Sequence, residues 1–469
     1  MNQAKKWIVQ WIEENKEQYL NIAQQLWDHP ELSMQEYIAS NTLAALLEKN
    51  GFLVERGVAG IPTAFVAIYG HGSPVIGFSS EYDALPSLSQ KIDCNAKAPV
   101  TPGAPGQGCG HNLLSVTGIL GATALKNFMK ENKLEGTIKV FGTPAEELCI
   151  GKPFMAREGV FLGVDAFLDW HPAFLHRAGA CSTNAYFNLK YHFKGKTAHG
   201  NSPWFGRSTL DAGMLMGHAI EMLREHIRPG NEDAASTINY AFPDVGNSFP
   251  NVVPDKTTVW CIGRFKNAEL AAEVISRVDK CAEGAATATE TTVEREFITA
   301  THDMIPNLVM SNAVDENLRW IGVPGYTEEE DWAAKDVQKN MGIPETGFPK
   351  KILPVALGSM PVTDSSEYSW FAPLALLNLA LVPSLETGWH NWAATKFSGS
   401  SVGMKLIDTA AKILASTGYD LLTKPEIIAE AKEEHKDRLG GKSYKSLLSE
   451  DAKPDLGINR DIMEKFKKS

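Results

Sequence analysis

The chain has 469 residues and a formal net charge of −11 at pH 7, and 43% of its residues are hydrophobic against 22% charged. This length exceeds what one hydrophobic core usually supports, so we expect two domains. The acidic balance excludes nucleic acid or an anionic membrane surface as the main partner, because both select basic surfaces.

The first 27 residues predict an amphipathic helix and not an export signal. Charged side chains recur throughout this stretch, and it lacks the apolar centre of a signal peptide. No apolar run in the sequence is long enough to span a bilayer. The six cysteines show no paired spacing, which favours reduced thiols. We therefore expect a cytoplasmic protein with no membrane partner.

Strands and helices are expected to alternate from there to about residue 182. Short apolar runs bounded by Gly, Ser and Pro alternate with longer helical patterns. This alternation predicts an α/β fold with a mostly parallel sheet, in which chemistry gathers in the loops at the carboxyl ends of strands. The strands are expected at residues 63–70, 74–86, 136–147 and 163–172, and the helices up to Gly51 and over 113–132.

The pattern changes between residues 183 and 302. The order there is β-α-β-β-α-β, which is typical of an α+β unit of the ferredoxin-like type. We therefore predict a first domain of residues 1–182 and 303–469, with a second domain of residues 183–302 inserted into it. The last 45 residues or so are expected to be helical. The inserted elements are expected at residues 185–195, 207–226, 235–246, 256–265, 267–287 and 291–300.

Cys109 and His111 stand two residues apart in GQGCGHNLLSV, directly before a predicted helix. On extended backbone, side chains two positions apart point to one face, and the flanking glycines permit a tight turn. Three interpretations fit the pair: a nucleophile with its base, two metal ligands, or a buried thiol beside an ordinary histidine.

Glu146 and Glu147 are adjacent in GTPAEELC, where a predicted strand ends in a polar turn. Adjacent carboxylates on a helix surface are usually only solvated. In a turn after a buried strand, one carboxylate can bind a metal while the other takes a proton from water, because neighbouring residues point in different directions.

Two histidines and an aspartate also lie at expected strand ends or in a Gly- and Trp-rich loop. His171 follows an apolar strand in FLDWHPA, and His390 lies in ETGWHNWA. Asp83, in SSEYDALP, could hydrogen-bond a histidine ligand or simply cap a turn. Thiolate, imidazole and carboxylate together suit a divalent transition metal. The candidate ligands are Cys109, His111, Glu147, His171 and His390.

Two other kinds of site have less support. A cysteine protease would use Cys109 as nucleophile with a separate histidine, which leaves the glutamate pair and His390 without a role. The sequence contains no glycine-rich nucleotide-binding pattern, so a nucleotide site has no support.

Eight segments, in order along the chain, resemble a known family. The sequence is similar to the metal-dependent amidohydrolases and aminoacylase-type metallopeptidases, a family that includes hippurate hydrolase and the auxin-conjugate hydrolases. The similarity is greatest to the branch called aminobenzoyl-glutamate utilisation protein B. The segments are DHPELSMQE, EYDALPSLSQ, GQGCGHNLL, GTPAEE, DWHP, KTAHGNSPWFGRSTLDA, FPNVVPD and VTDSSEYSW.

The resemblance implies roles for individual residues. Glu146 matches the general base, and Asp83 matches the residue that orients the site. His199 matches a lid histidine that reaches the active site of the neighbouring subunit, while Asn251 and Arg264 match lid positions that contact substrate. Arg264 is suited to a substrate carboxylate. Cys109, His111, Glu147, His171 and His390 match the metal ligands.

The resemblance also implies a zinc-peptidase-like catalytic domain, with residues 183–302 as a lid and dimerisation domain. It implies one or two divalent metal ions per subunit, zinc or manganese, with cobalt as an alternative. Many peptidases of the family have a histidine ligand two residues before the aspartate, where this chain has Glu81.

The implied reaction is hydrolysis of the amide bond of an N-acyl amino acid. An aromatic acyl-glutamate such as p-aminobenzoyl-glutamate is the expected substrate, and a homodimer through the lid is the expected assembly. One alternative is a dipeptidase that acts on Xaa-basic dipeptides. Another is a weakly active subunit that needs a paralogous partner chain.

Overall fold

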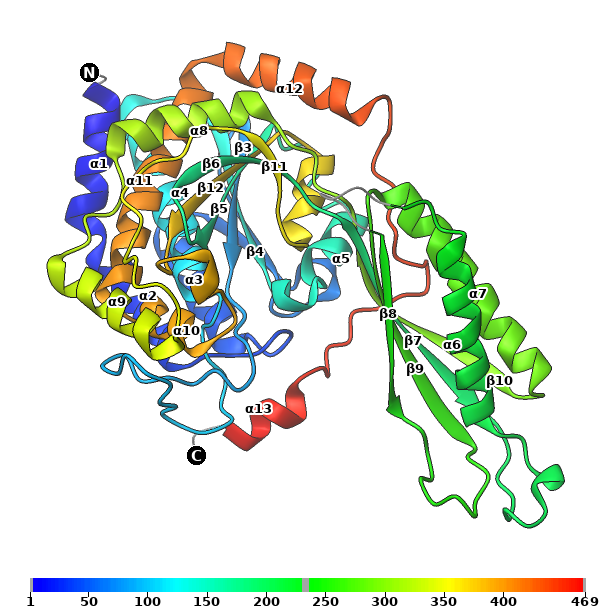
Figure 1. Ribbon diagram of the computed structural model, residues 1–469. Coiled ribbons are helices and arrows are strands. Elements are labelled where there is room, and N and C mark those ends of the chain that lie inside the picture. The colour runs from blue at the N-terminus through cyan, green and yellow to red at the C-terminus, as the bar shows by residue number, and fades with distance from the viewer. Residues whose placement is uncertain (1–2, 230–235, 467–469) are drawn as a thin grey trace.

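The structure, a computed structural model, describes residues 3–229 and 236–466. The chain forms an α/β unit around an eight-stranded sheet, and a smaller unit around a four-stranded antiparallel sheet that projects to one side of it (Figure 1). This arrangement confirms the predicted fold class. No helix in the described ranges is both long enough and apolar enough to cross a membrane.

The larger unit contains the elements on both sides of the insertion. Before it come α1 (Gln3–Asn15), α2 (Glu17–Asp28), α3 (Tyr37–Lys49), β1 (Leu53–Arg56), η1 (Val58–Gly60), β2 (Phe65–His71), β3 (Val75–Glu81), α4 (His111–Asn132), β4 (Gly136–Thr143), η2 (Glu146–Leu148), α5 (Gly151–Arg157), β5 (Ala166–Ala173) and β6 (Arg177–Ser182). After it come α8 (Leu308–Ile321), α9 (Glu328–Met341), β11 (Leu357–Ser359), η4 (Asp364–Trp370), β12 (Leu374–Ala380), η5 (Leu385–Thr387), α10 (Trp392–Ser398), α11 (Ser401–Thr423), α12 (Pro425–Leu439) and α13 (Arg460–Phe466).

The eight-stranded sheet has the order β1-β2-β4-β3-β5-β12-β6-β11. Its four central strands, β4, β3, β5 and β12, are mutually parallel. β12 lies between β5 and β6, which are consecutive in the chain, and it pairs parallel to β5 and antiparallel to β6. The carboxyl ends of the four central strands therefore meet at one edge of the sheet.

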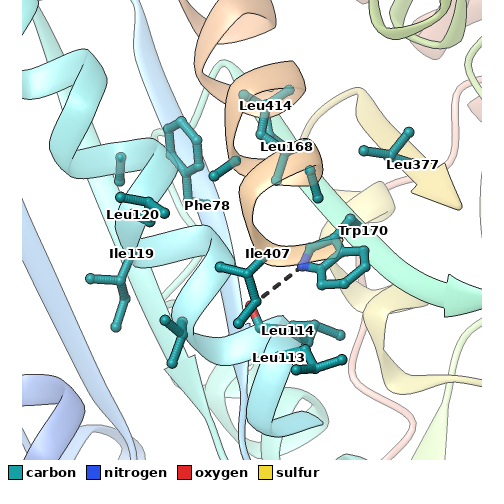
Figure 2. Close-up of a cluster of buried hydrophobic side chains, with 14 of the residues drawn as sticks. Phe78, Leu113, Leu114, Ile119, Leu120, Leu168, Trp170, Leu377, Ile407 and Leu414 are labelled. Atoms are coloured by element: carbon teal, nitrogen blue, oxygen red, sulfur yellow. Dashed lines mark hydrogen bonds between the residues drawn. The ribbon is translucent and has the colours of Figure 1, made fainter. Parts of the chain in front are cut away.

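Helix α4 is buried around most of its circumference because it lies between the sheet and α11. Gly118 permits this close packing, since a Cβ atom there would lie 2.1 Å from the carbonyl oxygen of Ser79. Trp170, on β5, is fully buried against α4, and its indole nitrogen donates a hydrogen bond to the carbonyl of Leu114 at 3.4 Å (Figure 2). This packing fixes the first turn of α4, where His111 lies, against the end of β5.

The smaller unit contains β7 (Ala185–Lys194), η3 (Pro203–Phe205), α6 (Thr209–Glu225), β8 (Thr237–Asp244), β9 (Lys256–Phe265), α7 (Ala268–Ala288) and β10 (Thr292–Thr301). Its strands have the order β10-β7-β9-β8, and α6 and α7 cover one face of this sheet (Figure 1). Ala235, where we expected β8 to begin, lies outside the described residues. Tyr186 pairs with Arg264 at the end near the larger unit, and Lys194 pairs with Lys256 at the far end.

The two ends of the chain differ from the sequence-based expectation. The helix expected over the first 27 residues is two helices that meet at Lys16, and residues 1–2 lie outside the described part. The last 45 residues are not continuously helical, because Gly440 and Gly441 both adopt positive φ and end α12. The chain then passes the smaller unit, where Lys442 pairs with Glu269, and returns to the larger unit at α13 (Figure 1).

Candidate metal centre

The candidate ligands converge at the carboxyl edge of the four central strands. This follows from the topology, because parallel neighbouring strands end on the same side of a sheet. Asp83 follows β3, Glu146 and Glu147 follow β4, His171 lies near the end of β5, and His390 lies in the loop after β12. Cys109 and His111 are presented at the start of α4, which packs beside these strands.

The backbone around these residues is unusually constrained. Gly110, between Cys109 and His111, has φ of +80°, and a Cβ atom there would lie 3.1 Å from Leu381 and Pro172. His390 has φ of 56°, in the left-handed region that costs a non-glycine residue about 1–2 kcal/mol. Ala145 and Cys149, on either side of the glutamate pair, also have a left-handed backbone conformation. Such strain is typical of functional sites.

The side chains form three overlapping groups whose potential ligand atoms lie within 4.8 Å of one another. Two of these groups share the Cys109 thiol. In the first, Sγ of Cys109 is 3.5 Å from Nε2 of His171. In the second, Nε2 of His390 is 3.2 Å from Oε2 of Glu147. The groups are Cys109–His111–His171, Cys109–Glu147–His390 and Glu81–His111–Glu146.

Hydrogen bonds fix which nitrogen each buried histidine presents to the cluster. Nδ1 of His111 is 3.0 Å from Oδ1 of Asp83. Burial alone would raise the pKa of Asp83, but the hydrogen bonds with His111 and Ser33 hold it below its usual value, so the carboxylate is ionised and accepts from Nδ1. Nδ1 of His171 donates to the carbonyl of Pro172 at 2.7 Å, and burial lowers the pKa of His171 to about 4. Both residues therefore turn Nε2 toward the cluster.

The residues fit a divalent cation. Among the described side chains, Nε2 of His111 and Oε1 of Glu147 are buried without a hydrogen-bond partner, and they lie 4.0 Å apart. Burial raises the pKa of the Cys109 thiol and of the Glu147 carboxyl, so without a neighbouring cation both favour the protonated form. A divalent cation would stabilise the thiolate and the carboxylate and would satisfy both unpartnered atoms.

Several residues at the site had no role assigned from the sequence. Lys152 of α5 is fully buried, with its ammonium 2.6 Å from Oε1 of Glu81 and in contact with Asp364. Burial alone would lower the pKa of Lys152, but the neighbouring carboxylates of Asp364 and Glu81 raise it well above its usual value. Lys152 therefore carries a positive charge. Ser365 donates to Glu81 at 3.0 Å. The segment VTDSSEYSW was the indication in the sequence for Asp364 and Ser365, whereas Lys152 had none.

The smaller unit places its three candidate residues at two different ends. His199 and Asn251 lie together in the loops at the far end, with Nδ2 of Asn251 3.4 Å from Nε2 of His199. Arg264 lies at the near end, with its guanidinium 5.6 Å from the ring centre of Tyr186. Within residues 3–229 and 236–466, no hydrogen bond or ion pair joins His199 to the cluster of the same chain.

Comparisons with known proteins agree with this architecture. Residues 182–290 match the M20 peptidase dimerisation domain. The chain is 35% identical to one of the subunits of p-aminobenzoyl-glutamate hydrolase from Escherichia coli, over 93% of this chain and 95% of that protein. The chain belongs to the M20 family of peptidases and amidohydrolases. As an M20 protein it is a hydrolase of amide bonds, and its ligand groups support the use of a divalent metal.

Other known proteins resemble the chain in sequence or in fold. The chain is 25% identical to a mouse Xaa-Arg dipeptidase, with 91% of each chain covered. A dinuclear metal-binding peptidase of the M20 family from Bacillus subtilis has the same fold with a TM-score of 0.54 and 19% identity, over 87% of this chain and 98% of that one. The 35% identity to the Escherichia coli subunit covers 93% of this chain, so the M20 assignment extends over nearly its whole length.

Replacing Cys109 by Ser is expected to weaken metal retention, since a hydroxyl is a poor substitute for a thiolate ligand. Metal content after dialysis, measured by inductively coupled plasma mass spectrometry, should fall below that of the native protein. Cys281→Ser, in helix α7 of the smaller unit, is a matched control and should retain metal. Equal metal content in both variants would identify Cys109 as only a buried thiol.

Proposed function

We propose that this protein hydrolyses the amide bond of N-acyl amino acids, with an aromatic acyl-glutamate such as p-aminobenzoyl-glutamate as substrate. The observation that carries the proposal is Glu146, a buried carboxylate that lies within the third of the candidate ligand groups, with Oε2 3.8 Å from Nε2 of His111. The name of the Escherichia coli relative supports the acyl-glutamate class.

In this proposal five side chains hold the cation or cations: Cys109, His111, Glu147, His171 and His390. The two ligand groups that share Cys109 support two adjacent positions. Thiolate, imidazole and carboxylate together suit zinc or manganese, with cobalt as an alternative. A bound divalent cation would polarise the attacking water and the scissile carbonyl.

Glu146 acts as the general base. Burial and the neighbouring Glu81 raise the pKa of its carboxyl, which makes it a better proton acceptor than an exposed glutamate. Glu146 accepts a proton from the attacking water and then donates it to the leaving amine, so it ends the cycle ionised. Asp83 positions His111 by accepting the hydrogen bond from its Nδ1.

The lid residues serve two different subunits in this proposal. Arg264 pairs with Tyr186 near the start of β7. Lys194, eight positions after Tyr186, ends β7, and His199 lies in the loop beyond it. At about 3.3 Å per residue these ends are about 26 Å apart, too far to meet in one site. We assign residues 183–302 to a lid and dimerisation domain. Arg264 binds the substrate carboxylate in its own subunit, while His199 and Asn251 contact the substrate of the neighbour.

Exposed aromatic side chains support an aromatic acyl group. Trp204 and Phe205, in the loop that contains His199, are 67% and 64% exposed, and their ring centres are 5.8 Å apart. They are therefore not part of the lid core. In the assembled dimer they would offer an aromatic surface beside His199.

Mixing two inactive variants is expected to restore activity. In a heterodimer of Glu146→Gln and His199→Ala chains, one site has both substitutions and the other has neither. Activity should rise toward half that of a native dimer for each heterodimer formed, measured after subunit exchange. Two identical Glu146→Gln preparations, mixed in the same way, provide the baseline. Confirmed exchange with no gain in activity would contradict a role for His199 across subunits.

A substrate panel tests the proposed reaction. Purified protein loaded with zinc, manganese or cobalt should release the amino acid from acyl-glutamates, with aromatic acyl groups preferred. The alternative substrate class, Xaa-basic dipeptides, is favoured by the similarity to the Xaa-Arg dipeptidase. Preferential cleavage of those dipeptides would support the alternative, and no cleavage of any compound would contradict both.

A second alternative concerns assembly. The name of the Escherichia coli relative describes it as one subunit of its enzyme, which supports a heteromer with a paralogous chain. Metal analysis and activity of this chain expressed alone distinguish the two cases. A homodimer should bind metal and turn over substrate by itself, whereas a heteromer should bind metal but need the second chain for turnover.

A further inference from the structure

The segment Thr363–Glu367 lies directly against the proposed general base. It begins η4, and all five of its residues are buried. Oγ1 of Thr363 donates a hydrogen bond of 2.7 Å to Oε1 of Glu146. Oε2 of Glu146 is the oxygen nearer to His111. The two carboxylate oxygens therefore differ, because Oε1 is hydrogen-bonded to Thr363 and Oε2 faces the metal-ligand cluster.

The direction of the Thr363 hydroxyl is fixed by the fold. Thr363 is the N-cap of η4, and its Oγ1 accepts a hydrogen bond of 3.1 Å from the backbone N–H of Ser365. A hydroxyl has one proton to donate. Because Oγ1 accepts from the N–H of Ser365 and a carboxylate oxygen can only accept, the single hydroxyl proton is donated to Glu146.

Three flanking contacts hold this segment in place. Asp364 accepts a hydrogen bond from the backbone N–H of Lys152 at 3.1 Å and also contacts its ammonium. Glu367 accepts two hydrogen bonds from His302, at the end of β10, within 2.9 Å. Ser365 donates to Glu81. Buried, charge-assisted contacts of this kind make a rigid support.

We propose that Thr363 is a positioning residue for Glu146, which holds Oε1 so that Oε2 faces the water to be deprotonated. The inference rests on the proposed role of Glu146 as general base. Without the hydroxyl, the carboxylate would be free to rotate about its last side-chain bond, and a misdirected base loses catalytic efficiency. In this proposal the contact orients the base and takes no part in binding the substrate.

Replacing Thr363 by Val should lower kcat about 10- to 100-fold, the range expected for one hydrogen bond to a charged group. KM and metal content should remain unchanged. Thr363→Ser keeps the hydroxyl and should stay within about threefold of the native kcat. Thr327→Val removes the equivalent N-cap of α9, away from the site, and should lower stability without lowering kcat.

Two results would overturn the proposal: native kcat in Thr363→Val, or an equal loss in Thr363→Val and Thr363→Ser. Crystal structures of both metal-free variants give a readout that needs no substrate. The Glu146 carboxylate should change its orientation in Thr363→Val and keep it in Thr363→Ser, and an unchanged orientation in both would contradict the positioning role. A native protein that cleaves no acyl-amino acid would instead contradict the proposed function.

Discussion

Replacing Glu146 by Gln is expected to lower kcat by roughly 10²–10⁴, the usual contribution of a general base. The amide keeps the size of the side chain and can still contact Thr363, but it cannot accept the proton of the attacking water. Metal content and the unfolding midpoint should stay close to those of the native protein. The variant is measured by steady-state kinetics on the best substrate of the panel, after metal analysis.

Glu158→Gln is a suitable control for this experiment. Glu158 directly follows α5, its side chain is half exposed, and it pairs with Arg157 on the surface. Its replacement removes the same charge and should leave kcat within a factor of two. A Glu146→Gln protein with near-native turnover would remove Glu146 from the mechanism.

Replacing Lys152 by Met is expected to lower the free energy of unfolding by about 3–5 kcal/mol, the cost of removing one partner from a buried ion pair. Lys152 is completely buried, and its ammonium contacts both Glu81 and Asp364. Met has a similar length but no charge, so both carboxylates would be left buried without their cation. Equilibrium urea unfolding of the metal-free protein measures the loss.

Lys432→Met provides the comparison, because Lys432 forms an ion pair with Asp165 in which its own side chain is 49% exposed. Exposed pairs of this kind contribute about 0–1 kcal/mol. We therefore expect Lys152→Met to lose clearly more free energy of unfolding than Lys432→Met. Equal losses would mean that Lys152 contributes no more than a surface lysine.

The elements that follow a simple hydrophobic period could be predicted closely. Residues 256–265 were expected as a strand, and β9 has these bounds, because KTTVWCIGRF places apolar side chains mainly on the buried face. The break at Lys16 could not be predicted, since the sequence has no glycine or proline there. In the fold, α1 packs against both α11 and α4, whereas α2 packs mainly against α4, and a local pattern does not contain these neighbours.

Some residues of the candidate site could be predicted from the sequence, and others could not. Ligand-type residues at expected strand ends could be placed together, because the topology of a parallel sheet makes those ends neighbours. The contact of Lys152 with Asp364 joins residues 212 positions apart. Lysine is rarely fully buried, so a local sequence pattern gives no reason to expect this side chain in the interior. Only the assembled fold shows that this ammonium is surrounded by carboxylates.

The position of β12 in the sheet has a consequence for biosynthesis. β5 and β6 are joined by a short turn, yet β12, which begins about 190 residues after β6, must lie between them. At 5–20 residues per second, a ribosome needs about 10–40 s to reach it. A hairpin forms within about 1–10 μs. On a nascent chain, β5 and β6 are therefore free to pair with each other long before their native neighbour exists, and any hairpin that they form has to open to admit β12. Pulsed hydrogen exchange on chains that end before Leu374 should detect it as protected amides in β5 and β6. Completion of the sheet thus requires that β5 and β6 are not paired with each other when β12 arrives.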